Sequence, residues 1–190
     1  MAKGMYYYLR QAWKKPDNEV LRQRMIAWRQ GDSIIEVDKP LRLDRARSLG
    51  YKDKKGFIVF RVRIVRGGRK KHRINHNRRS KRQTVRLILQ MNYKEVAEQR
   101  VARKYTNLEI LNSYQIGKDG KHYFFDVIAV DPEREEIKND MTINWICRPE
   151  NRGRAFRGLT SAGKKARGLR NKSPELKVRP SARANDRRGN

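Results

Sequence analysis

Lysine and arginine are the side chains of this sequence whose spacing points most directly to a chemical role. From Arg61 to Arg86 there are twelve of them and no acidic residue. Gly67 and Gly68 stand within this tract, and residues without a side chain let a ligand approach the backbone closely. Guanidinium and ammonium groups hydrogen-bond to phosphate oxygens and replace condensed counterions. The tract therefore predicts contact with a polyanion.

A second basic segment, residues 148–190, holds fourteen basic and three acidic side chains. Within it, residues 158–165 read Gly-Leu-Thr-Ser-Ala-Gly-Lys-Lys, which is similar to a nucleotide-binding Walker A loop. Lys165, however, stands where such a loop needs a magnesium-binding Ser or Thr, and no apolar strand precedes the stretch. Nucleotide hydrolysis is therefore disfavoured, and a backbone nest that binds an anion is the alternative.

The remaining polar residues form no catalytic pattern. No Ser/His/Asp set, Cys/His pair or pair of carboxylates can be placed from spacing, and the acids of residues 131–140 fit an exposed helix. His72 and His76 have no Cys or acidic residue beside them, which disfavours a zinc site. Cys147 fits a small core residue. We therefore expect no enzymatic activity, cofactor, metal or small-molecule substrate.

The net charge of +28 over 190 residues exceeds what a self-contained domain usually carries, because self-repulsion opposes compaction. Nucleic acid, an anionic membrane or an acidic protein would neutralise it. No apolar run is long enough to span a bilayer, residues 1–5 lack a signal core, and the charge is not gathered on one amphipathic helix. A single cysteine fits a reducing compartment. We therefore expect an intracellular nucleic-acid partner and no membrane contact.

Charge also divides the chain into parts. Residues 91–147 hold eight basic and ten acidic side chains, whereas the segments on either side are strongly basic. We expect an α+β core domain over 1–147, which includes a basic loop at 66–86, and a basic Gly/Arg-rich RNA-binding tail over 148–190. The tail has little apolar surface to offset the entropy of ordering it, so its structure should need a partner.

Local patterns predict helices and one strand in the first 65 residues. The expected elements are a helix over 5–15 ended by Pro16, a helix capped by Asp17 or Asn18, an irregular stretch over 31–42, a helical turn over 44–51 closed by Gly50, and a strand over 57–65. The aromatic residues Tyr6–Tyr8, Trp13 and Trp28 are expected to pack in the core, with base stacking as the alternative.

Further along, the pattern changes to a helix followed by a hairpin. The expected elements are a long polar connection over 69–84, a short strand or helix over 84–89, a helix over 93–105 with the capping pattern of Asn92 and Glu95, strands over 108–116 and 121–130 around a turn at 117–120, a helix over 133–139 capped by Asp131, and an extended piece over 142–147. Both faces of strand 121–130 are apolar, which places it inside the sheet. The expected fold is α+β, with a small, mostly antiparallel sheet.

A series of stretches, in order and with matching spacing, resembles the large-subunit ribosomal protein family fifteen-e of archaea and eukaryotes. They are Tyr7–Trp13, Asp44–Lys52, Phe57–Arg63, Arg66–Lys70, Leu111–Tyr114, Phe124–Ile128, Asp131-Pro132 and Arg157–Lys164. The last is the most specific. Residues 69–86 share the family's charge more than its residues, and the end after Arg170 is short, in the archaeal style.

The resemblance implies a structural constituent of the large ribosomal subunit, in the cytoplasm, that supports translation without catalysis. Its partners would be large-subunit ribosomal RNA and neighbouring large-subunit ribosomal proteins. It implies a three-layer domain with helices on both faces of the sheet and extensions that thread through RNA. A free-standing nucleic-acid-compacting protein and an RNA-processing factor remain the alternatives.

We expect basic residues to contact phosphates, glycines to allow close approach, and folded RNA to be recognised mainly by its shape. In the first half of the chain the expected RNA-binding residues are Arg45, Arg47, Lys52, Lys54, Arg61, Arg63, Arg66, Gly67, Gly68, Arg69, Lys70, Lys71, Arg73, Arg78, Arg79 and Arg82. In the second half they are Arg152, Arg154, Arg157, Gly158, Gly163, Lys164, Lys165, Arg167 and Arg170.

Overall fold

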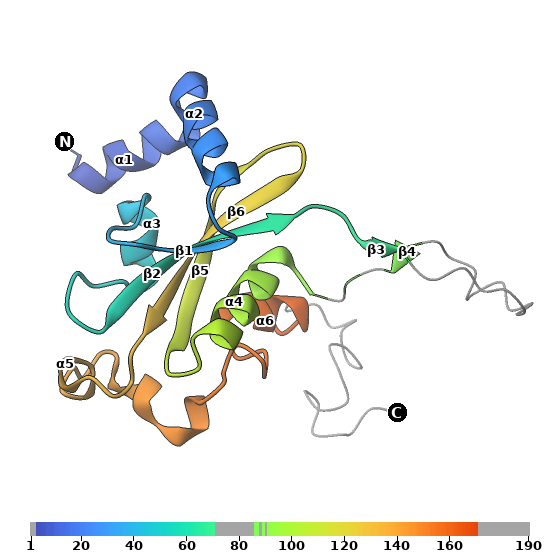
Figure 1. The fold of residues 1–190 in the computed structure, drawn as a ribbon. Coiled ribbons are helices and arrows are strands. Elements are labelled where there is room, and N and C mark those ends of the chain that lie inside the picture. The colour runs from blue at the N-terminus through green and yellow to red at the C-terminus, as the bar shows by residue number, and fades with distance from the viewer. Residues whose placement is uncertain (1–2, 71–85, 88, 90, 171–190) are drawn as a thin grey trace, which may run out of the picture.

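The computed structural model describes residues 3–70, 86–87, 89 and 91–170. The helices in these residues are α1 (Met5–Lys14), α2 (Asn18–Gln30), α3 (Leu43–Ser48), α4 (Tyr93–Lys104), α5 (Glu135–Lys138), α6 (Ser161–Ala166) and the 3-10 helices η2 (Asn144–Cys147) and η3 (Pro149–Asn151). The strands are β1 (Ile34–Val37), β2 (Phe57–Val65), β3 (Arg69–Lys70), β4 (Arg86–Leu87), β5 (Glu109–Lys118) and β6 (His122–Val130). Figure 1 shows how these elements are arranged around a central sheet.

The central sheet has four strands in the order β1-β2-β6-β5, and every neighbouring pair is antiparallel. Strand β6 lies between β2 and β5, and all of its residues from Phe124 to Val130 are buried. The register with β2 places Arg61 opposite Asp126. The predictions of a mostly antiparallel sheet and of an inner strand at 121–130 are therefore confirmed.

Helices cover both faces of this sheet, so the domain has three layers. On one face, apolar side chains of α2, α3, α5 and η2 form a core with the strands, including Trp28, Ala46 and Ile137. On the other face, Ala97 and Val101 of α4 pack on a second apolar cluster. The two clusters take alternate residues of β6, as strand geometry requires. The expected α+β fold is confirmed.

Helix caps and alternation in the sequence predicted these elements well. The Asp17 side chain accepts a hydrogen bond at 2.9 Å from the backbone as α2 begins, and Asn92 accepts one at 2.9 Å from the Glu95 N–H as α4 begins. Gly50, with φ of +99°, follows α3 in the left-handed conformation that commonly ends helices. Strand β2 covers the predicted residues 57–65.

The prediction that residues 31–42 are irregular is wrong, because Ile34–Val37 forms β1. This strand pairs along the outer edge of β2, with Ile34 opposite Val62. Four residues are too few for an alternating pattern to stand out, so the strand depends on the hydrogen-bonding edge that β2 offers it.

The extended piece predicted over 142–147 is also wrong, because this stretch contains η2. The backbone carbonyl of Asp140 accepts a hydrogen bond from the Asn144 N–H at 2.8 Å, which curls the chain into tight turns. The preceding helix is shorter than expected and begins at Glu135. Asp131 does not cap it; its carboxylate accepts a backbone hydrogen bond two residues further on.

Residues 148–170, which we call the closing segment, were expected to need a partner for their structure, yet they fold against the sheet. Arg154 is 8% exposed, and its Nη1 donates hydrogen bonds to the carbonyls of Ile110 at 2.5 Å and Leu111 at 2.9 Å. Ala155 joins the apolar cluster beneath α4. Contacts within the protein therefore order this segment.

A buried carboxylate joins the closing segment to the rest of the domain. Glu98 of α4 has no exposed surface, and it accepts hydrogen bonds from the hydroxyls of Ser113 on β5 and Thr160, both at 2.5 Å. Burial raises the pKa of Glu98, and the two hydroxyls partly offset that rise. A helix, a strand and the closing segment thus meet at one polar group.

Strands β3 and β4 form a separate two-stranded ribbon, which Figure 1 shows reaching away from the central sheet. Arg69 lies opposite Leu87, and Lys70 lies opposite Arg86. Within the stretch 84–89, expected to be a short strand or helix, residues 86–87 form a strand, and residues 84, 85 and 88 lie outside the described residues. The connection between β3 and β4 lies outside the described residues.

Candidate nucleic-acid interface

Some of the predicted RNA-binding residues lie outside the described part of the chain: Lys71, Arg73, Arg78, Arg79 and Arg82. For Arg69 and Lys70 the structure describes the backbone, as β3. The other predicted residues fall into two groups. Some are held inside the protein, and others lie on its surface.

Arg61 belongs to the first group. Its guanidinium lies 4.7 Å from the Trp28 ring and its Nε lies 3.4 Å from Asp126 Oδ1, without hydrogen-bond geometry. Asp126 is buried and also accepts a hydrogen bond from the Tyr114 hydroxyl at 3.0 Å. Burial raises the pKa of Asp126, and the positive charge of Arg61 opposes that rise. Arg61 therefore neutralises an internal acid.

Lys52 and Lys54 also have partners within the protein. Both ammonium groups contact Asp140 Oδ2, at 2.6 and 2.5 Å. Lys52 donates a further hydrogen bond to the Thr142 hydroxyl, and Lys54 donates one to the Glu136 carbonyl. These lysines hold the pKa of Asp140 well below its usual range. They fasten the loop before β2 to the turns after α5.

The end of β2 is fixed by contacts that aim the basic ribbon outward. Arg63 donates a hydrogen bond to the Arg29 carbonyl, and Arg66 donates one to the Asp119 carbonyl at 2.8 Å. Gly67 has φ of +100°, and its N–H donates to the Tyr93 hydroxyl at 2.9 Å. Gly68 follows, and β3 begins at the next residue. The glycine turn therefore sets the direction in which the ribbon leaves the sheet.

Three cations from three helices converge beside the β5 edge of the sheet. Lys94 of α4 is half-buried, and its pKa is lowered first by burial and then by the positive charges of Arg45 on α3 and Lys165 on α6. Glu98 acts in the opposite direction, but it is buried and hydrogen-bonded. Clustered like charges repel one another, and a bound anion would reduce that repulsion.

Sequence reasoning missed Lys94, because it lies in the nearly neutral stretch 91–147. Arg45 and Lys165 were predicted separately, and neither prediction placed them together. The only sequence signal for Lys94 is its position in the first turn of the predicted helix 93–105, where a cation is unfavourable. A cation at this unfavourable position is a reason to suspect that Lys94 has a role other than stabilising the helix.

Several predicted residues of the closing segment serve its own folding. Arg154 is occupied by two backbone carbonyls, and Arg157 donates hydrogen bonds to the carbonyls of Glu150 and Arg152. The Gly163 N–H donates to the Thr160 hydroxyl at 3.2 Å. That bond uses a donor that the anion-nest alternative would require, so the nest is not open in this structure.

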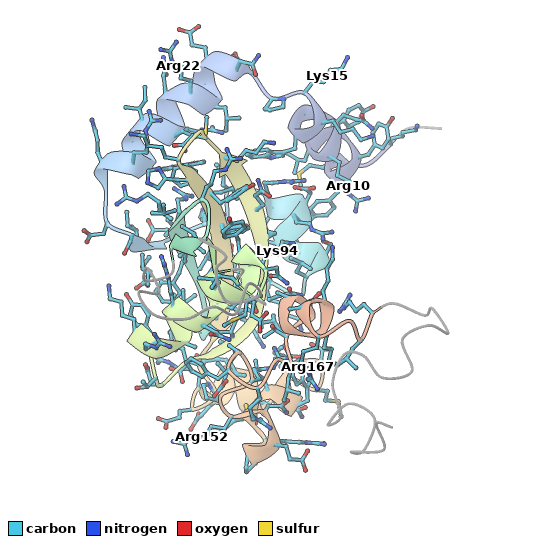
Figure 2. The ribbon with its side chains drawn as sticks, turned by 90° about the vertical axis from the view of Figure 1, so that its right-hand side faces the viewer. Arg10, Lys15, Arg22, Lys94, Arg152 and Arg167 are labelled. Atoms are coloured by element: carbon cyan, nitrogen blue, oxygen red, sulfur yellow. The ribbon has the colours of Figure 1, made fainter. Side chains whose placement is uncertain are left out.

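Other basic residues of this segment reach the surface. Arg152, Lys164, Lys165 and Arg170 are exposed, and Arg167 is partly exposed beside the Gly158 carbonyl. Arg47 on α3 is exposed as well. Figure 2 labels Arg10, Lys94 and Arg167 along one side of the molecule, from α1 past α3 to α6. Exposed cations thus lie on several elements of the described chain.

Helix α1 exposes aromatic residues. It has no buried residue; Met5 is 58% and Tyr8 is 62% exposed. The prediction that the aromatic residues pack in the core is therefore confirmed for Trp28, which is 9% exposed, and wrong for Tyr6–Tyr8. The reason is that α1 touches the body mainly near its end, where Arg42 lies 5.1 Å from the Trp13 ring.

The described ranges contain neither a membrane-spanning helix nor a cluster of metal-ligating side chains. No helix there has the length and apolar character needed to cross a bilayer. Nor do these residues bring together three or more His, Cys, Asp or Glu side chains that could hold a metal ion. His72 and His76 lie outside the described residues.

Comparison with known proteins agrees with the resemblance seen in the sequence. The profile of the family described as "Ribosomal L15" matches residues 4–185. Large ribosomal subunit protein eL15 of Methanospirillum hungatei is 48% identical over 194 residues, which cover 99% of each chain. The protein of the same name from Methanocella arvoryzae is 46% identical over 195 residues, with both chains covered completely. The chain therefore belongs to the eL15 family of large-subunit ribosomal proteins.

Proposed function

We propose that this chain is a structural constituent of the large ribosomal subunit, where it binds and stabilises folded large-subunit ribosomal RNA. In the cytoplasmic ribosome it would also contact neighbouring large-subunit proteins. The observation that carries the proposal is a group of cations from separate helices. Lys94 and Lys165 line one surface groove, the charge of Arg45 also acts on Lys94, and the nearby acids Glu95 and Glu98 are buried. Membership of the eL15 family supports it.

The mechanism is charge neutralisation by residues that a folded domain holds in place. Surface cations of α3, α4 and α6 would replace counterions along RNA phosphates, and so would the basic residues of 66–86 and 148–190. Packed RNA helices offer phosphates at spacings set by their shape, which an ordered array of cations can match. No step of this function requires catalysis by the protein.

Sedimentation tests the proposal. A tagged full-length chain is expressed in an archaeal host, and the extract is separated on a sucrose gradient at moderate salt. We expect the chain in the large-subunit fraction, and ribonuclease should release it whereas deoxyribonuclease should not. A pool that sediments with DNA and is absent from the subunit would favour the free-standing nucleic-acid-compacting alternative instead.

Matched variants sharpen this test. Changing Arg45, Lys94 and Lys165 together to Gln removes three surface charges, and changing Lys52, Lys54 and Arg61 to Gln removes three that have partners inside the protein. We expect the first variant to leave the subunit at lower salt than wild type while it keeps its thermal stability. The second should lose thermal stability. Equal salt resistance of wild type and the first variant would contradict the proposed contacts.

A further inference from the structure

A groove of about 290 Å³ lies where α4, α6 and β5 meet. We call it the α4–α6 groove. Its floor is the face of the sheet, and its walls come from the first turns of the two helices, which Figure 1 shows side by side. Its volume is close to the lower end of the roughly 300–1,000 Å³ of small-molecule sites. The groove therefore has room for one nucleoside-sized group.

Two carboxamides from β5 line this groove, Asn112 and Gln115. The Asn112 Oδ1 accepts a hydrogen bond from the Ser113 N–H, while its amino group makes no hydrogen bond within the described residues. Gln115 is exposed, and its Nε2 makes a long contact of 3.5 Å with the Gly117 carbonyl. A contact of that length is easily exchanged for a ligand. Carboxamides carry both donors and acceptors, as the edge of a nucleobase does.

Part of the groove lining is apolar and fixed in place, beside the polar side chains of Asn92, Ser113 and Ser161. Tyr123 and Phe125 of β6 contribute to its floor, and Ala162 of α6 lies at its side. The Tyr93 and Tyr123 rings pack with centroids 4.7 Å apart, and Gly67 holds the Tyr93 hydroxyl. An apolar, preformed wall beside a few polar groups suits a flat heteroaromatic base.

The charge around the groove selects for an anionic ligand. Lys94 of α4 and Lys165 of α6 line it from two sides, and the positive charge of Arg45 helps to lower the pKa of Lys94. Glu98 is directed inward to Ser113 and Thr160. Glu95 directly follows Lys94 in the first turn of α4 but is buried, and the charge of Arg167 acts on it. Cations therefore flank the mouth, and the nearby acids are buried.

We propose that the α4–α6 groove binds one unpaired nucleotide of RNA. The base would lie against Tyr123, Phe125 and Ala162 with its edge on Asn112 and Gln115, and Lys94 and Lys165 would take the phosphates on either side. This inference rests on the proposed RNA-binding function and adds to it a contact that depends on a base. Unpaired, splayed bases are where proteins usually read RNA directly.

The experiment compares RNA with and without bases. Fluorescence anisotropy measures the affinity of the full-length chain for unstructured ribonucleotide pentamers and for a ribose–phosphate pentamer of equal charge that lacks bases. We expect Gln115→Leu to weaken binding of the base-bearing pentamers by about threefold to tenfold, the loss expected for one hydrogen-bonding group, and to leave the base-free pentamer unchanged. Gln99→Leu, on α4 outside the groove, is the matched control and should change neither.

Nuclear magnetic resonance locates the site independently. Addition of adenosine or cytidine 5′-monophosphate to the full-length chain should shift the side-chain amide signals of Asn112 and Gln115 more than that of Gln99. Equal affinity of the wild type for both kinds of pentamer, or equal losses in the two variants, overturns the inference while RNA binding itself stands. Failure of the wild type to bind either pentamer would instead count against the proposed function.

Discussion

A Cβ atom on Gly163 would lie 2.5 Å from the Cα of Gly158 and 2.8 Å from its carbonyl carbon. The first turn of α6 therefore packs directly on the backbone of the preceding loop. Gly158 has φ of +67°, so it meets this contact in a conformation that favours glycine. The sequence pattern predicted that both glycines let a phosphate approach closely. In the structure they let two stretches of the same chain do so.

This contact predicts that Gly163→Ala destabilises the protein. The backbone of Gly158 cannot move aside as the end of a flexible side chain could, so we expect a loss of about 1–3 kcal/mol in the free energy of unfolding. Urea denaturation measures it. Gly120→Ala is the control, because a Cβ there would meet no atom within 4 Å, and it should stay within about 0.5 kcal/mol of wild type. Equal effects at the two positions would contradict the packing described.

The buried carboxyl of Glu98 predicts that the difference in stability between wild type and Glu98→Gln depends on pH. Because burial raises its pKa, the folded chain holds the Glu98 proton more tightly than the unfolded chain does. Its contribution to stability is therefore fully present below the ordinary pKa of about 4.5 and is lost as the pH rises through the folded-state value. Glu98→Gln is neutral at every pH, so its stability relative to wild type should increase from about pH 4.5 upward. Denaturation of both proteins across this range is the measurement, and a constant difference would count against it.

Lys165 and Lys54 should differ in the salt dependence of RNA binding. Lys165→Gln removes a surface cation of the converging group, so the log–log slope of affinity against salt should fall by up to about one unit. Lys54 already contacts Asp140 and the Glu136 carbonyl, so Lys54→Gln should leave the slope near its wild-type value. Titrations at several salt concentrations decide between these outcomes. A larger change for Lys54 than for Lys165 would reverse the assignment.

Arg61 predicts a stability effect without an effect on RNA. Arg61→Met leaves the Asp126 charge buried without its cation, which typically costs about 3–5 kcal/mol. Adding Asp126→Asn removes that charge, and the double variant should recover part of the loss. Thermal and urea unfolding measure both variants. The salt slope of RNA binding should not change in the double variant; a fall of one unit would mean that Arg61 contacts RNA after all.

The sequence predicted the elements whose signals are local. Alternation identified β2 and β6, and the side-chain caps Asp17 and Asn92 identified the starts of α2 and α4. These signals act within a few residues, so they can be recognised in the sequence without knowledge of the rest of the fold. The mostly antiparallel sheet followed from them, because a short turn between two strands leaves little other choice.

The parts that sequence reasoning missed depend on distant partners. Strand β1 forms because β2 lies beside it. The closing segment is ordered because Arg154 reaches carbonyls 43 and 44 residues earlier and Thr160 reaches Glu98. Its many Arg, Lys and Gly residues resemble those of a tail without structure of its own. The composition of the closing segment therefore predicted that it is basic, but it did not predict the contacts that order it.

The sequence predicted which types of residue the candidate interface contains, but not where on the folded protein they lie. Every basic residue looked equally available in the sequence, whereas the fold turns Arg61 under α2 and pairs Lys52 and Lys54 with Asp140. It also brings Lys94, from the nearly neutral part of the chain, into one groove with Lys165 and within reach of the charge of Arg45. The sequence alone does not separate the cations that have partners inside the protein from those on its surface. That difference depends on how the helices pack around the sheet.

The hydrogen bonds of Glu98 also bear on how the protein is made. Thr160 lies 62 residues after Glu98, so during synthesis α4, β5 and β6 emerge long before the second hydroxyl that Glu98 needs. Until then, the nascent chain carries a carboxylate with one of its two hydroxyl partners and an apolar face that the closing segment will later cover. Folding therefore finishes with residues that are translated late. A chain that ends before Thr160 would leave Glu98 without its second hydroxyl partner and the apolar face uncovered, so we expect proteases to cleave it faster than the full-length chain.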